Sequence, residues 1–390
     1  QGDSTSLSSL SHLRPRSDED RAEVLSKLFN PAAQGQARYH LVDFTLYNLH
    51  ITTAAAYRII RELSIGMSVS YVFGSLDLAF ARDVALEGGA KLDQGEVVAL
   101  DNCGGGASCG YENDAAAEAI RTRGTSHGLA FGAGVLVRPH EDVDVGLGYN
   151  SEVVGVGGDD IPTKGDAWVL RSEASLANWT GAGNIYRDLV GRSTVTYRLP
   201  HQLNLGVTWR PSRRLLFNGQ ARWQHLNRFG QFEIQLTGTE FRAAPRMPDR
   251  INLYRGYQDL FTFQLGGSYL LLEPLGIQGA VMVETAAVPG SAVTVATIDG
   301  VKVDMFLGLT WQVYRGLALR LGYGLVLMAP VDSEASDRSP SLMVECVDSR
   351  YSVDLAACKA TARGQGMPSS AGRYALTIHR VGFGISYDVY

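Results

Sequence analysis

Two stretches near the C-terminal end of the chain alternate strictly between apolar and other residues. In 301–312 the apolar side chains occupy the odd positions from Val301 to Trp311, and in 317–327 they occupy the odd positions from Leu317 to Leu327. A short turn at 314–316 joins them. A period of two predicts β-strands, because successive side chains point to opposite sides of a sheet. The sequence therefore predicts an antiparallel hairpin with one apolar face.

The same alternation recurs along the chain and predicts about 11 strands. Short turns and long, polar, glycine-rich connections follow one another in strict order. This is typical of an up-and-down antiparallel barrel with tight turns at one end and long loops at the other. The predicted strands lie in 38–58, 63–71, 129–138, 143–150, 203–210, 217–224, 261–269, 275–284, 301–312, 317–327 and 373–390, and the predicted loops in 81–124, 155–190, 228–257, 287–299 and 331–372.

The apolar faces of these strands could contact lipid or a second protein sheet. The opposite faces combine charged and amide residues with many glycines, which suit the interior of a barrel better than an open solvated surface. We therefore predict an all-β, antiparallel up-and-down transmembrane barrel over 37–390, with a soluble double-sheet protein as the alternative. The non-glycine residues on the predicted inner face include Arg222, Gln224, Gln264, Glu284, Lys302, Asp304 and Arg320.

Composition narrows the classes further. The 390 residues are 45% hydrophobic and 19% charged, with a net charge of −5 and a mean hydropathy of −0.04. No apolar stretch reaches the roughly 18–20 residues of a membrane-spanning helix, and the mild acidity gives no basic surface for nucleic acid. The four cysteines form two pairs that are close in sequence. Because their spacing matches no zinc motif, we predict two disulfides within loops, Cys103–Cys109 and Cys346–Cys358, and free thiols are the alternative.

Several stretches carry a resemblance to a known family. They read TAAAYRIIRELSIGMSVSYVFGSLDL (53–78), FGAGVLVRPHEDVDVGLGYNSEV (131–153), YRLPHQLNLGVTWRPSRRLLFNGQARWQHLNRF (197–229), DLFTFQLGGSYLL (259–271) and ETAAVPGSAVTVATIDGVKVDMFLGLTW (284–311). In order and spacing they resemble the FadL/TodX type of outer-membrane barrel, which takes up long-chain fatty acids and aromatic hydrocarbons. The similarity runs from about residue 38 to the end. No single stretch is specific by itself, and the resemblance rests on the order and spacing of all of them.

The resemblance implies a barrel of about 14 strands with an N-terminal hatch inside the lumen, an even strand number being the rule for single-chain barrels of this kind. With about 11 strands here, we expect three strands and the hatch to precede Gln1. Residues 1–36 are then a polar extracellular loop. The alternative is a reduced hatch, since Asn30-Pro31-Ala32 matches a short motif of the family's hatch.

Passive uptake of a hydrophobic molecule across a bacterial outer membrane is the function that the resemblance implies. The long loops capture the molecule, the lumen binds it, and it leaves sideways into the bilayer. Binding a fatty-acid carboxylate inside the protein requires a buried cation or several hydrogen-bond donors. Arg222, Lys302 and Arg320 are the candidate cations, Gln224 and Gln264 the neutral donors. Glu284 and Asp304 could instead neutralise the cations in a purely structural arrangement.

The 155–190 loop has short helical phasing and more apolar residues than a solvated loop needs. We interpret it as a capture groove for the ligand, or alternatively as a lid packed on its own strands. The candidate groove residues are Ile161, Trp168, Leu170, Trp179, Ile185, Tyr186 and Leu189.

Other functions stay open. A polar-solute porin or an adhesion scaffold would share the barrel. An outer-membrane lipid hydrolase would need a serine and a histidine at the rim, but His140, His201, His225 and His379 are scattered in sequence without an obvious serine or acid partner. We expect no enzyme activity, no cofactor and no metal site, and a monomer whose partners are the hydrophobic ligand and outer-membrane lipids.

Overall fold

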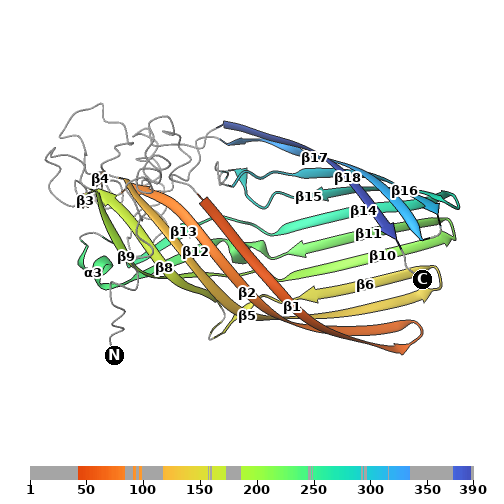
Figure 1. The fold of residues 1–390 in the computed structure, drawn as a ribbon, viewed down its shortest axis with the longest axis horizontal. Helices are drawn as coiled ribbons and strands as arrows, with labels where there is room; N and C mark the ends of the chain where they lie inside the picture. Colours follow the sequence, from red (N-terminus) through yellow and green to blue (C-terminus); the bar gives the residue numbers. More distant parts are fainter. Residues whose placement is uncertain are drawn as a thin grey trace.

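A computed structural model describes the residues 43–83, 91–93, 96–98, 117–156, 158, 160–172, 186–244, 247, 249–290, 293, 297–314, 316–333 and 372–387. Almost all of them lie in antiparallel strands (Figure 1). The four cysteines and the predicted N-terminal segment 1–36 lie outside the described residues. None of the described helices is long and apolar enough to span a membrane.

The main sheet contains 16 strands, and β3 pairs separately with β4. The strands are β1 (Asp43–Ile60), β2 (Leu63–Asp83), β3 (Lys91–Asp93), β4 (Glu96–Val98), β5 (Ala117–His140), β6 (Val143–Asn150), β7 (Val154–Gly155), β8 (Ile161–Ser172), β9 (Tyr186–Tyr197), β10 (Gln202–Ser212), β11 (Leu215–Gln224), β12 (Gln231–Thr237), β13 (Arg250–Tyr254), β14 (Leu260–Leu272), β15 (Leu275–Glu284), β16 (Lys302–Tyr314), β17 (Leu317–Ser333) and β18 (Gly372–Tyr387). A 3₁₀ helix (Leu226–Phe229) and α3 (Thr239–Ala243) flank β12.

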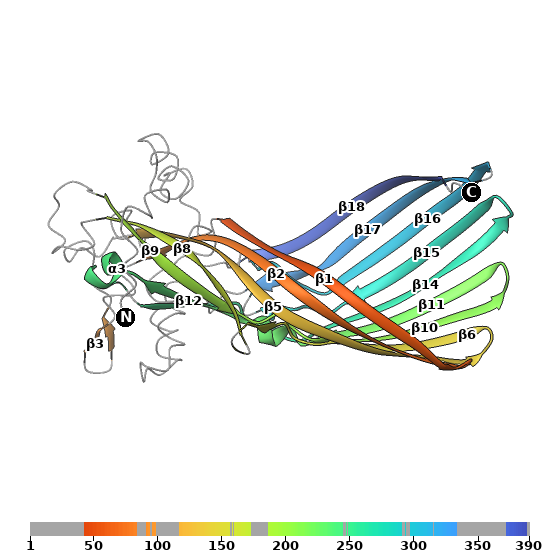
Figure 2. The same cartoon turned by 60° about the horizontal axis from the view of Figure 1, so that its bottom comes forward.

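The predicted hairpins are confirmed. Tight turns join β1 to β2, β5 to β6, β10 to β11, β14 to β15 and β16 to β17, and all five turns gather at one end of the molecule (Figures 1 and 2). Each predicted strand corresponds to one long strand of this wall. The wall is not closed among the described residues, since β1 pairs only with β2 and β18 only with β17.

The sheet forks at β5. Its half near the turns pairs with β6, for example Val135 with Leu147, whereas its other half pairs with β8, for example Ile120 with Val169. We call the part of the sheet that runs from β8 through β9 and β12 to β13, with the half of β5 that pairs with β8, the upper branch. We call the part that runs from β6 through β10, β11 and β14 to β18, with the half of β5 near the turns, the lower branch. Much of the predicted loops 155–190 and 228–257 is therefore strand, and β5 already begins inside the predicted loop 81–124. Strands β8 and β9 were missed because polar or small residues interrupt the apolar alternation on their buried faces, as at Thr163, Gly165, Gly191 and Ser193.

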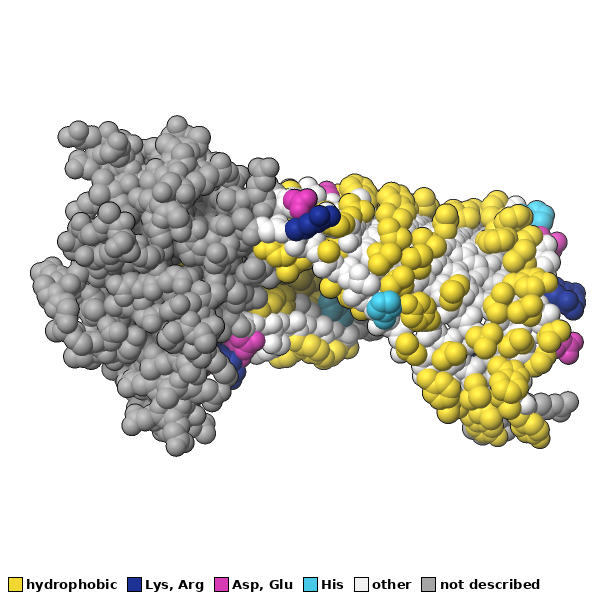
Figure 3. Space-filling model, turned by 90° about the horizontal axis from the view of Figure 1, so that it is seen from above, with side chains coloured by type: hydrophobic (Ala, Val, Ile, Leu, Met, Phe, Trp, Pro, Cys, Tyr) yellow, Lys and Arg dark blue, Asp and Glu magenta, His cyan; other side chains and the backbone are white. Residues whose placement is uncertain are grey.

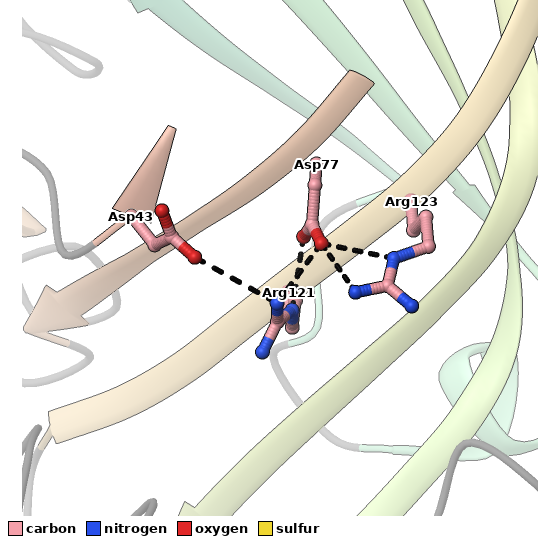
Figure 4. A network of polar contacts seen from close by, with 4 residues as sticks. All are labelled: Asp43, Asp77, Arg121 and Arg123. Carbon is pink, nitrogen blue, oxygen red and sulfur yellow. Dashed lines mark hydrogen bonds and ion pairs between the residues drawn. The ribbon is translucent and has the colours of Figure 1, made fainter. Parts of the chain in front are cut away.

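The two branches have opposite polarity. On β2, the outward residues Met67 and Val69 are 67% and 58% exposed, while the inward positions between them carry serine or glycine. Beyond Phe73 the pattern reverses: Leu76 and Leu78 are fully buried on the inward side. On the outward side of the same segment, Asp77 accepts hydrogen bonds from Arg121 and Arg123, and Arg121 also faces Asp43 (Figure 4). The strand thus passes from an apolar outer surface to a polar one.

The upper branch encloses a hydrophobic core. Its inward side chains come from β2, β5, β8, β9, β12 and β13, and they include Leu78, Ile120, Val169, Ile234 and Ile251. Along the lower branch, apolar side chains instead form an exposed outer band, and charged side chains lie at its two margins (Figure 3). About ten residues of β2 lie within this band, which matches the 9–11 residues of a transmembrane strand. The polarity reversal therefore marks the outer border of the membrane.

Candidate functional site

All seven predicted lumen residues lie on the inward face of the lower branch, as the strand registers show. The structure brings three of the predicted residues and one further acid into contact or near contact at the upper ends of β15 and β16. Lys302 Nζ lies 2.7 Å from Glu284 Oε1 and 2.6 Å from Asp299 Oδ1. Asp304 follows one inward position beyond Lys302. Lys302 is thus neutralised by protein carboxylates, and this pairing favours a structural role for it.

The two predicted arginines, Arg222 and Arg320, differ from Lys302 in having neutral neighbours. Arg222 donates through Nε to Asn204 Oδ1 at 3.0 Å, and Gln224 donates to Gln202 Oε1 at 3.2 Å. Gln264 lies opposite Gln220 on β11, and Arg320 opposite Thr310 on β16. Within the described part of the wall, no carboxylate forms an ion pair with Arg222 or Arg320.

Basic residues outnumber acidic ones on the inner face of the transmembrane wall. Near the turns, Asp144 accepts a hydrogen bond from Arg138 Nε at 2.6 Å and another from Arg210 Nη1 at 2.7 Å. The inward basic residues are Arg58, Arg138, Arg210, Arg222, Lys302, Arg320 and Arg380, and the inward acidic ones are Asp144, Glu284 and Asp304. Such a surface attracts anions.

Between these charged groups, the inner face carries small and amide side chains. A cavity of about 800 Å³ lies along β1, β2, β5, β6, β10 and β11. Many of its inward positions are glycine or alanine, and its inward polar groups are the side chains of Ser64, Ser68, Asn150, Asn204, Thr208, Asn218 and Gln220. The added Cβ of a residue at Gly148 or Gly206 would meet no atom within 4 Å, so these glycines widen the passage.

The proposed capture groove in 155–190 is not an exposed loop. Ile161 and Leu189 are 2% and 1% exposed and belong to the hydrophobic core of the upper branch, and Trp168 is 7% exposed. The helical phasing was misleading, because β8 and β9 are strands that bury one side. Leu170 and Tyr186 lie on these strands, with side chains outside the described set, and Trp179 and Ile185 lie outside the described residues.

Sequence reasoning missed an arginine inside this apolar interior. The Arg255 guanidinium lies over the rings of Phe44 and Phe232, 5.9 and 5.6 Å from their centroids. Further rings extend the cluster, with centroids 5.1 Å apart for Phe229 and Phe232, and 5.9 Å apart for Phe229 and Tyr257. Among the described residues, no carboxylate forms an ion pair with Arg255.

Burial dominates the electrostatics of Arg255. Loss of water around the guanidinium lowers the pKa of Arg255, and burial likewise raises the pKa of Tyr257. An arginine remains charged at any ordinary pH, so the protein keeps a partly desolvated cation here. The sequence contains only a weak indication of this cluster, because Arg255 and Tyr257 lie some 25 residues after the aromatic residues Phe229 and Phe232. Only the fold adds Phe44, which is some two hundred residues away.

Comparison with known proteins identifies the family. A model of the outer membrane transport proteins described as OMPP1/FadL/TodX matches residues 29–363. No curated protein matches the chain in sequence.

Solved structures share the fold. A Pseudomonas aeruginosa FadL homologue superposes with a TM-score of 0.65 and 15% identity, covering 90% of this chain and 70% of that one. The CymD monoaromatic hydrocarbon channel gives 0.51 and 17%, covering 73% and 70%. The P. putida toluene transporter TodX gives 0.51 and 15%, covering 74% and 65%, so this chain spans slightly less than two thirds of that protein.

The family match covers most of the chain, and the apolar outer band and up-and-down wall agree with it. The molecule therefore lies in the bacterial outer membrane, with its apolar band in the bilayer. This chain belongs to the outer-membrane transport family of FadL and TodX.

Proposed function

We propose that this protein admits hydrophobic molecules that carry a carboxylate, with long-chain fatty acids as the substrate class. The apolar interior of the upper branch takes up the acyl chain, and Arg255 binds the carboxylate. Roughly 25 cal/mol per Å² of buried apolar surface drives such a molecule out of water. The observation that carries the proposal is Arg255, a partly desolvated arginine within an aromatic cluster that pairs with no carboxylate among the described residues.

The charge inside the wall supports the same substrate class. Beyond the upper branch, the carboxylate would meet an inner face rich in arginine, including Arg222 and Arg320. A ligand without a charge gains nothing from these groups. A polar-solute porin would also fit a charged lumen, but it would have no use for the aromatic cluster around Arg255.

Lateral release into the bilayer completes the proposed route. At the turn end, the Arg138–Asp144–Arg210 network gives the lumen a polar surface, which is unfavourable for an acyl chain. The hydrocarbon outside the wall is the better solvent for it. We also propose that further strands fill the wall between β1 and β18, because unpaired backbone groups are costly in lipid.

Ligand binding to variants of the full chain tests the assignment. Arg255→Met keeps most of the side-chain volume and removes the charge. Because hydrogen bonds to charged groups contribute about 1.5–3 kcal/mol, palmitate affinity should fall by about tenfold to hundredfold. Arg250→Met is the matched control: Arg250 lies on the outward face of β13 and pairs with Glu233 at 3.3 Å, so its loss should leave affinity unchanged. Equal affinities for both variants and the unmodified protein would overturn the assignment of Arg255.

An aromatic hydrocarbon is the second candidate, because the Phe44, Phe229, Phe232 and Tyr257 rings could pack against one. The same variants separate the two substrate classes. Toluene binding would be insensitive to Arg255→Met and would weaken with Phe232→Leu, whereas palmitate binding would respond to both substitutions. A protein that binds toluene tightly and palmitate not at all would favour the second candidate.

A further inference from the structure

A cluster of metal-binding side chains lies where the wall forks. Glu152 lies between β6 and β7, His201 directly before β10, and His225 directly after β11. One possible ligand atom from each of the three lies within 4.8 Å of the others. All three side chains are half-buried.

The strand register explains how residues far apart in sequence meet here. The backbone N–H of His225 donates to the carbonyl of His201 at 3.0 Å, so the two histidines are opposite each other at the end of the β10–β11 ladder. Both stand two residues beyond the outward side chains Leu203 and Trp223. The cluster therefore lies on the outer side of the wall, next to the outer border of the apolar band.

The histidine ring nitrogens lie close to the spacing that a shared metal ion requires. His201 Nε2 and His225 Nδ1 face each other at 2.6 Å. Zn²⁺ binds imidazole nitrogen at about 2.0–2.1 Å, which places two tetrahedral ligand atoms about 3.3 Å apart. The two nitrogens need to separate by less than about 1 Å to admit the ion.

Each histidine also has an outer partner for its second nitrogen. His201 Nδ1 lies 3.2 Å from the Tyr149 hydroxyl, and His225 Nε2 lies 3.9 Å from Asp259 Oδ1. That carboxylate oxygen is buried and accepts no hydrogen bond from any described residue, whereas Oδ2 accepts from Trp223 Nε1 at 3.0 Å. Metal-bound histidines usually donate their second N–H to a carboxylate, carbonyl or water. The orphan oxygen of Asp259 is thus placed to accept from a metal-bound His225.

The carboxylate of Glu152 completes the set. Its Oε1 accepts a hydrogen bond from Arg228 Nε at 3.0 Å, which leaves Oε2 for a ligand bond. Two imidazole nitrogens and one carboxylate oxygen suit Zn²⁺ among the divalent cations. We propose that Glu152, His201 and His225 bind one Zn²⁺ ion, with water in the fourth position. The ion would join the end of β6 to β10 and β11 and so hold the fork in place.

No metal site was predicted from the sequence, because His140, His201, His225 and His379 are scattered along it. The register of β10 and β11 makes two of them neighbours, and the bend after β6 adds the acid. His379 offers a contrast: its Nδ1 contacts only the Tyr323 hydroxyl at 2.8 Å, and among the described residues it belongs to no such cluster.

Zinc titration of the full chain tests the proposal. The untagged protein in detergent is treated with chelator, its thiols are blocked with iodoacetamide, and Zn²⁺ binding is measured by calorimetry and elemental analysis. We expect one bound ion, at least tenfold weaker binding for His201→Ala and for His225→Ala, and unchanged binding for His379→Ala. Asp259→Asn should weaken binding by about tenfold or more, since it removes the outer partner of His225.

Co²⁺ provides a readout that does not depend on affinity alone. Its visible absorption should show a tetrahedral site in the unmodified protein and lose that signal in Glu152→Gln, a nearly isosteric change that preserves the fold. Heat-modified migration in electrophoresis verifies that each variant forms a barrel. Absence of Zn²⁺ binding, or equal binding by the His201→Ala/His225→Ala double variant, would overturn the proposal.

Discussion

Arg121 on β5 donates two parallel hydrogen bonds to Asp77 on β2, Nε to Oδ1 and Nη2 to Oδ2, both 2.9 Å long (Figure 4). The pair lies on the outward face of the sheet, only four residues along β2 from Phe73. A paired arginine and aspartate on this face indicate water outside the upper branch. The contact therefore places the membrane border between Phe73 and Asp77.

Removing the carboxylate measures the environment of this pair. Asp77→Asn keeps the shape of the side chain and leaves Arg121 and Arg123 charged. Exposed ion pairs contribute only about 0.2–1 kcal/mol. Because the Asp77 side chain is partly buried, urea unfolding in lipid vesicles should show a loss at the upper end of this range, about 1 kcal/mol. A loss of several kcal/mol would mean that the arginines face hydrocarbon, which would move the border.

Lysine substitutions on one face of β2 locate the border directly. Met67 and Ser75 both point outward, and Met67 lies within the apolar band. A lysine near the bilayer midplane costs about 2–4 kcal/mol, against about 0–1 near the interface. Met67→Lys should therefore be the costlier change in vesicle unfolding, and Ser75→Lys nearly neutral. Similar costs at both positions would contradict the polarity reversal.

Arg255 should reduce stability while it serves binding. Burial lowers the pKa of Arg255 because it disfavours the charged form. A lowered pKa for a base means that the charged form costs free energy in the folded state. The guanidinium does not deprotonate at ordinary pH, so the cost is constant between about pH 5 and 9. Arg255→Met should unfold at an equal or higher urea concentration at every pH tested, and palmitate should stabilise it less than the unmodified protein.

A core substitution tests whether the upper branch is a packed core of its own. Ile234 on β12 is fully buried. Ile234→Ala should cost about 2–5 kcal/mol through lost contacts and a residual cavity. Leu205→Ala on the lipid-facing side of β10 is the control, since Leu205 is 45% exposed and lipid can fill the space. A smaller cost at 234 than at 205 would show that the upper branch is loosely packed.

Two facing glycines make the fork possible. Gly124 on β5 lies opposite Gly165 on β8, and a Cβ at Gly165 would collide with the Arg123 carbonyl. Gly165→Ala should push β8 away from β5 and destabilise the upper branch, which protease sensitivity of β8 and β9 would detect. Gly206→Ala, where no atom lies within 4 Å of the added Cβ, should change nothing. Equal protease resistance would show that the strands accommodate the methyl group.

The alternation of residues was sufficient to predict the transmembrane wall. Because side chains on a strand alternate between two faces, runs such as 301–312 and 317–327 identified the strands, their lipid-facing residues and their inward residues without any tertiary information. The turn at 314–316 and its counterparts also established which end carries the tight connections. The family resemblance carried by 53–78 and 197–229 was correct for the same reason, since those motifs are local.

Tertiary structure alone decided what the faces enclose above the membrane. Period two shows which residues share a face, but it does not show whether that face meets lipid, water or a core. On β2 the apolar residues change sides after Phe73, and only the pairing of β5 with β8 reveals that Leu76 and Leu78 then point into a closed interior. The contact of Arg255 with Phe44, and the approach of Glu152 to the pair His201 and His225, join segments that no local pattern connects, because the tertiary fold brings distant parts of the chain together.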